Sequence, residues 1–230
     1  MKILETVLLS ILIVFPLLDL VLEKYRFKNK ISEYLKASFL LWAVTAFLMY
    51  AFSMGALGVS APDDISSSAL LNITALLAIL AFVVFMAYSA VSISTNRDVQ
   101  ARVSSAIQSG RDSMNELLPA TRREYLIFVL IVSVSAGICE ELLFRWYLLA
   151  WLELHANWLL ASVISSLVFG LWHLYLGWIH VIKSAAVGFL LCLLYLYFES
   201  IVFVIVLHIL MDIHAGTVAF LARKPVKDVD

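Results

Sequence analysis

Two adjacent glutamates, Glu140 and Glu141, lie inside an apolar stretch long enough to cross a membrane, and Arg145 follows in the same stretch. On membrane-insertion scales, a charged residue at the centre of a membrane helix costs about 2.5–3.5 kcal/mol. Three such residues would together cost roughly 8–10 kcal/mol if nothing compensated them. Because a structural role rarely needs this much buried charge, the cluster indicates a functional site within the membrane.

Helical spacing assigns the two glutamates to different faces of this helix. Glu141 and Arg145 are four residues apart and share a face, with the glutamate on the favoured amino-terminal side. Glu140 is rotated by about 100° from Glu141 and lies near the small residues Ala136 and Gly137, which would let another helix or a substrate approach closely. We therefore expect Glu141 and Arg145 to neutralise each other, which leaves Glu140 as a candidate general base.

Two other apolar stretches contain ionisable residues. One contains Phe169 and His173, and the other contains His208 and Asp212. Asp212 is four residues after His208, so it could orient the imidazole, or both side chains could point at one ion or water. A lone histidine in an apolar helix is more often a hydrogen-bonded core residue than a functional one. Together with the glutamate pair, however, these residues supply a base for water and groups that can stabilise an oxyanion, as amide hydrolysis requires.

The same residue types could hold a metal ion. Two histidines and one carboxylate are an acceptable ligand set for catalytic zinc with one open position. The candidate ligands are Glu140, His173 and His208. The sequence leaves open whether one divalent metal, most simply zinc, or a metal-free glutamate mechanism is used.

Membrane helices must position these side chains. The 230-residue chain is 63% hydrophobic and 14% charged, with a mean hydropathy of +0.98, whereas a soluble domain is nearer half apolar and a quarter charged. We predict an all-α, polytopic integral membrane protein with a single transmembrane domain over 1–230 and about seven spans, or eight if a segment near the fourth is re-entrant or split. The expected spans are 3–22, 37–59, 69–91, 124–153, 157–176, 178–198 and 201–221.

The positive charges predict the orientation of these spans. Lysine and arginine gather in 23–36, in 92–123 and in the C-terminal tail, whereas 60–68 has none. The positive-inside rule then places the N-terminus outside and the C-terminus in the cytosol. Apolar residues at near-helical spacing in 92–123 predict an amphipathic helix on the cytosolic membrane surface. The net charge of −1, without a long basic run, argues against a nucleic-acid partner.

Three motifs together resemble the signatures of the CPBP family, which comprises type II CAAX prenyl proteases and bacteriocin-processing or immunity proteins. The resemblance covers about 125–215, which we interpret as the catalytic core. Its motifs are Glu140-Glu141-x-x-x-Arg145, Phe169-x-x-x-His173 and His208-x-x-x-Asp212.

The resemblance implies an intramembrane endopeptidase, of metallo- or glutamate-type, in a prokaryotic plasma membrane. Its substrate would be a membrane-associated protein or peptide, prenylated or not. The implied catalytic residues are Glu140 and His173, which would activate water, and His208 and Asp212, which would stabilise the oxyanion or bind metal. The implied supporting residues are Glu141, Arg145 and Phe169.

Two positions depart from the family's pattern. Trp146 follows the arginine where relatives often have a small residue, and its bulk could narrow the cavity. Asp212 stands where prenyl proteases tend to have asparagine, which weakens the case for a prenylated substrate. The alternatives are a non-catalytic scaffold or immunity protein that binds a membrane partner, and an ion or proton transporter.

Counting residues along the spans gives one conflict. His173 is expected near the cytosolic end of its helix, whereas His208 is expected nearer the outer end. A shared site therefore requires tilted helices, a bent fourth span or different helix boundaries. Because water must reach the site, we also expect a polar cavity that opens toward the cytosol.

Overall fold

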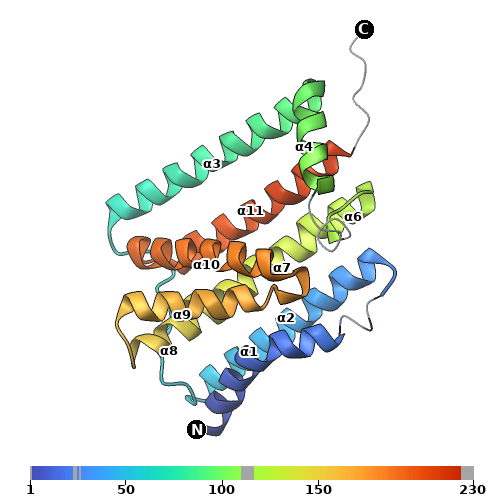
Figure 1. Ribbon diagram of the computed structural model, residues 1–230. Coiled ribbons are helices and arrows are strands. Elements are labelled where there is room, and N and C mark those ends of the chain that lie inside the picture. Colours follow the sequence, from blue (N-terminus) through green and yellow to red (C-terminus); the bar gives the residue numbers. More distant parts are fainter. Residues whose placement is uncertain (1, 23–24, 26, 110–116, 224–230) are drawn as a thin grey trace.

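The computed structural model describes residues 2–22, 25, 27–109 and 117–223, and over these residues it is a bundle of helices (Figure 1). Six helices are long and apolar enough to cross a membrane, which confirms the polytopic all-α fold. They are α1 (Lys2–Leu22), α2 (Lys30–Ser53), α3 (Ala69–Thr95), a fourth helix over Arg122–Glu153, α10 (Trp178–Phe198) and α11 (Ile201–Ala222). A seventh apolar helix, α9 (Trp158–Leu171), is shorter, with 14 residues.

The fourth helix continues through its whole length, with two π-helical segments and no break. Thr121 and Glu124 form a capping box at its start. A π turn bonds each N–H to the carbonyl five residues back, and such turns often occur at functional sites. The second of them contains Glu141 and Arg145. The segments are α6 (Arg122–Ile127), η2 (Phe128–Val132), α7 (Ser133–Glu140), η3 (Glu141–Leu148) and α8 (Leu149–Glu153).

The length of α9 removes the conflict between the two histidines. The expected span 157–176 is wrong, because the helix ends at Leu171 and is followed by a turn and the 3-10 segment η4 (Leu174–Leu176). A helix of 14 residues is about 21 Å long, which is less than the roughly 30 Å of the hydrocarbon core. His173 therefore lies at the end of a helix that is too short to reach the second membrane surface.

The second span also differs from its expected boundaries. The side chain of Asn29 accepts a hydrogen bond from Ile31 N at 2.9 Å and caps α2, so the helix begins at Lys30 rather than at residue 37. At the other end the chain turns at Gly55, where φ is +62°. Residues 30–36 of the basic segment 23–36, which is expected to precede the span, therefore form the first turns of α2.

The amphipathic helix is present as α4 (Arg97–Ser109), where Val99, Val103 and Ile107 are half-buried along one face. It packs against the end of α11, where the Gln100 side chain donates to the Leu221 carbonyl at 2.9 Å. Figure 1 shows α4, the start of α6, the C-terminal end of α11 and the start of α2 toward one end of the bundle. Most of the described lysines and arginines lie in these segments, which is the distribution that the expected orientation requires.

Cysteine labelling tests this orientation. Both native cysteines, Cys139 and Cys192, are buried and should give little background. We expect Ser105→Cys, in α4, to react with a membrane-impermeant maleimide only after the cytosolic face is opened. Ala61→Cys, in the α2–α3 connection, should react on intact cells, since both positions are exposed. Labelling in the reverse pattern would overturn the orientation.

Candidate active site

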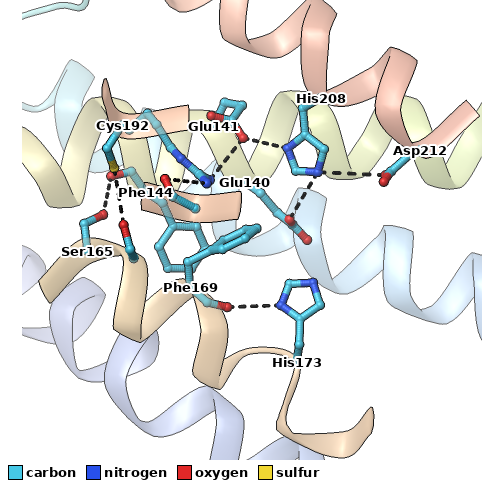
Figure 2. Close-up of polar contacts among 12 residues, drawn as sticks. Glu140, Glu141, Phe144, Ser165, Phe169, His173, Cys192, His208 and Asp212 are labelled. Atoms are coloured by element: carbon cyan, nitrogen blue, oxygen red, sulfur yellow. Dashed lines mark hydrogen bonds and ion pairs between the residues drawn. The ribbon is translucent and has the colours of Figure 1, made fainter. Parts of the chain in front are cut away.

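A buried network of charged side chains connects the fourth helix to α11 (Figure 2). The Glu141 and Arg145 side chains are 0% and 1% exposed, and Oε1 of Glu141 lies 3.0 Å from Nη1 of Arg145, which confirms the expected pair. The same oxygen accepts a hydrogen bond from Nδ1 of His208 at 2.6 Å. Glu141 therefore both neutralises Arg145 and orients His208.

The other nitrogen of His208 faces two more carboxylates. Nε2 of His208 lies 3.8 Å from Oε2 of Glu140 and 3.9 Å from Oδ2 of Asp212. Both distances are too long for direct hydrogen bonds but suit a bridging water. Of the two roles considered for Asp212, this geometry favours the shared site, because Glu141 already occupies the nitrogen that an orienting partner would use.

His173 comes from the turn after α9 and is held by Phe169. Its Nδ1 lies 3.1 Å from the Phe169 carbonyl, and the two rings are 5.0 Å apart. Because a carbonyl can only accept, Nδ1 carries the hydrogen, and in the neutral ring Nε2 is left as an acceptor. The Phe169 ring also lies 4.2 Å from the Arg145 guanidinium and 6.3 Å from the His208 ring, so it packs between all three.

Close helix packing brings these side chains together. A methyl group at Gly137 would lie 2.4 Å from the Ile209 side chain and 3.0 Å from its backbone nitrogen, so only glycine allows α7 and α11 to approach this closely. This contact confirms the close approach expected at Gly137 and brings Glu140 beside His208. A methyl group at Gly188 would lie 2.8 Å from the Phe169 ring.

A cavity of about 180 Å³ connects the site to the basic end of the bundle. Glu140 and His173 line its inner part, and Glu33, Lys36 and Leu117 line it toward the end where α2 starts. The Lys36 side chain is 27% exposed, so the cavity reaches toward solvent at this end. The cavity opens toward the basic end of the bundle, as expected, but it is less polar than expected. Much of its wall is apolar: Phe15, Leu40, Leu41, Phe128, Val132 and Trp172.

Trp146 does not narrow this cavity, so that expectation is wrong. Its indole N–H donates to the Ser60 carbonyl at 2.7 Å, and its ring packs edge-on against Phe52 at 5.1 Å. A residue that follows Arg145 directly is turned well away from it around the helix axis. The side chain therefore packs under the α2–α3 connection and not among the cavity-lining residues.

The expected zinc ligands do not form a ready-made metal site. Among the described residues, no group of three or more histidine, cysteine, aspartate or glutamate side chains is arranged to hold a metal ion. Glu140 and His208 lie close together, whereas His173 reaches the cavity from the opposite side (Figure 2). A metal bound by Glu140, His173 and His208 stays a prediction that metal analysis must test.

Two cavity-lining residues, Asp19 and Trp172, were not identified as site residues from the sequence. The sequence could have identified Asp19 as a candidate, because an acidic residue inside an apolar helix needs an explanation. Nothing in the sequence marks Trp172 as a site residue, because a tryptophan in an apolar stretch is ordinary. Glu5, the other acidic residue of α1, accepts a hydrogen bond from Gly58 N at 3.0 Å, which involves it in the α2–α3 connection.

Comparison with known proteins supports the resemblance. Residues 122–214 match the family described as type II CAAX prenyl endopeptidase Rce1-like. The matched part contains all seven site residues named above, whereas α1 and α2, which form one side of the cavity, lie outside it. No curated protein and no solved structure matches the chain.

Proposed function

We propose, from the type II CAAX prenyl endopeptidase-like domain at residues 122–214, that this membrane protein is an endopeptidase that hydrolyses a peptide bond of a membrane-associated protein or peptide. One observation carries the proposal. The Glu140 side chain, only 12% exposed, lines a cavity together with the His173 imidazole, in a bundle with helices long and apolar enough to cross a membrane. A scaffold has little need for a carboxylate in this position.

The side chains suggest a division of roles. Glu140 removes a proton from the attacking water, and His173 orients that water through Nε2. When Nε2 of His208 is protonated, the imidazolium is paired with Glu141 and offers an N–H to the oxyanion of the tetrahedral intermediate. The proton taken by Glu140 then passes to the leaving amine. Glu141, Arg145 and Phe169 hold these groups in place.

The cavity's direction supports a substrate that enters from the cytosolic side. Its outer part lies at the end of the bundle where the described lysines and arginines gather, which the positive-inside rule assigns to the cytosol. The N-terminus is then outside and the C-terminus is in the cytosol. A prokaryotic plasma membrane remains part of the proposal.

A cleavage assay with purified protein tests the function. We expect the protein in detergent micelles to cleave an internally quenched peptide that ends in a prenylated Cys-a-a-X sequence, or its unprenylated counterpart. Comparing the two peptides decides whether prenylation matters. Metal content of the active protein, and activity after dialysis against a chelator, decide between the metal and metal-free mechanisms. No cleavage of either peptide in a broad sequence panel would contradict the proposal.

Substitutions at Asp212 test whether this side chain contributes to catalysis as a hydrogen-bond donor or as a charged carboxylate. In its protonated form the Asp212 carboxyl can donate a hydrogen bond to the oxyanion; the amide of asparagine can donate in its place, whereas alanine cannot. We therefore expect Asp212→Asn to keep kcat within about tenfold of wild type or to raise it, and Asp212→Ala to lower it about 10²-fold. Kinetics with the quenched peptide measure both. Equal losses in the two variants would mean that the Asp212 carboxylate itself is required.

A further inference from the structure

Pro16 interrupts the hydrogen bonding of α1 beside the cavity. Proline has no N–H, so the Leu12 carbonyl lacks the donor that residue 16 would normally supply. The indole N–H of Trp172 donates to this carbonyl at 2.8 Å in a buried bond. A contact between residues 160 positions apart is therefore available because of the proline.

Trp172 is held on two sides. Its ring stacks on Phe15 of α1 with the centroids 4.3 Å apart and an angle of 25°. It meets Phe144 of η3 edge-on, at 5.1 Å and 89°. The ring is only 5% exposed, so it is wedged between the first and fourth helices. Trp172 is the residue at which α9 ends, so these contacts lie at the C-terminal end of that helix.

The chain immediately after Trp172 carries His173. The backbone N–H of His173 donates to the Gly170 carbonyl at 3.0 Å, in the turn that Trp172 begins. Trp172 and His173 line the same cavity, and Phe15 lines it from α1. Because the two residues are covalent neighbours in a short turn, a shift of the indole would move the imidazole as well.

We propose that the bond from Trp172 to the Leu12 carbonyl is a latch that positions His173, and that Pro16 is a positioning residue because it leaves this carbonyl free. The latch rests on the proposed function and adds to it a residue outside the matched segment 122–214. Through the latch, α1 takes part in building the site as well as in crossing the membrane.

Pro16→Ala tests the latch. Alanine restores an N–H that shares the Leu12 carbonyl with the indole, so the indole bond weakens while α1 becomes a better helix. We expect kcat to fall about tenfold, KM to stay within about twofold, and the unfolding temperature not to fall. Trp172→Phe should lower kcat to a similar extent. The double variant should lose no more than either single variant, because both remove the same bond.

Trp146→Phe is the matched control. It removes another indole bond to a backbone carbonyl, the partly buried bond to Ser60, away from the cavity, and should change kcat by less than about twofold. Wild-type kcat in Pro16→Ala, or additive losses in the double variant, would overturn the latch. An equal loss of kcat in the control would also overturn it.

A measurement independent of catalysis separates this proposal from the proposed function. The ¹⁵N indole resonance of Trp172, assigned by its loss in Trp172→Phe, should shift in Pro16→Ala because its acceptor is then shared with a backbone N–H. An unchanged resonance would overturn the latch while leaving the endopeptidase proposal intact. A shifted resonance in a protein that cleaves no peptide would overturn the proposed function and the positioning role together, and only the contact itself would stand.

Discussion

Glu140→Gln is expected to lower kcat about 10²–10⁴-fold while the protein remains folded. The amide has nearly the shape of the carboxylate but cannot take a proton from the attacking water. The neighbouring pair, Glu141 and Arg145, is untouched, so the helix packing should persist. Single-turnover cleavage of the quenched peptide measures the loss, and size-exclusion chromatography with thermal unfolding measures the fold.

Glu153→Gln is the control for this variant. It makes the same change at the exposed end of the same helix and should keep kcat within about twofold. His173→Ala should reduce kcat by a similar order to Glu140→Gln, and combining the two should add little, because residues that act as a unit are not additive. Full activity in Glu140→Gln would remove the proposed mechanism. A cellular phenotype that survives both changes would favour the scaffold or immunity protein.

Local periodicity made part of this site predictable. Glu141 and Arg145 are one helical turn apart, so their pairing follows from helix geometry. The small side chain of Gly137 likewise indicated where a second helix could approach, and Ile209 lies there. Both inferences need only the sequence of the fourth helix, and neither depends on which helix packs against it.

Contacts between helices could not be derived in the same way. The hydrogen bond from His208 to Glu141 joins residues 67 positions apart, and periodicity gives only the face on which each lies. Hydropathy also failed at the end of α9, because Trp172 and Leu174 continue the apolar run beyond the helix. The 3-10 segment that follows the turn ends at Gly177, whose φ of +96° suits glycine.

The buried pair should dominate the stability of the site. Arg145→Gln removes the guanidinium from the buried Glu141 carboxylate, and breaking a buried pair in this way typically costs about 3–5 kcal/mol. Glu141→Gln should cost a similar amount, because Arg145 is then the unpaired charge. Unfolding in mixed micelles by titration with a denaturing detergent measures both. Lys36→Met, which breaks the partly exposed pair with Glu33, is the control and should cost at most about 1 kcal/mol.

The double variant Glu141→Gln, Arg145→Met distinguishes stabilisation from positioning. Removing both charges leaves no unpaired ion, so most of the lost stability should return. Activity should stay low, by about 10²-fold, because His208 loses the carboxylate that orients its Nδ1 and pairs with its protonated form. If activity returned together with stability, Glu141 would serve only to neutralise Arg145. If neither returned, the buried charges would be required for folding itself, and the role of Glu141 in orienting His208 would have to be read from Glu141→Gln in a protein whose fold is retained.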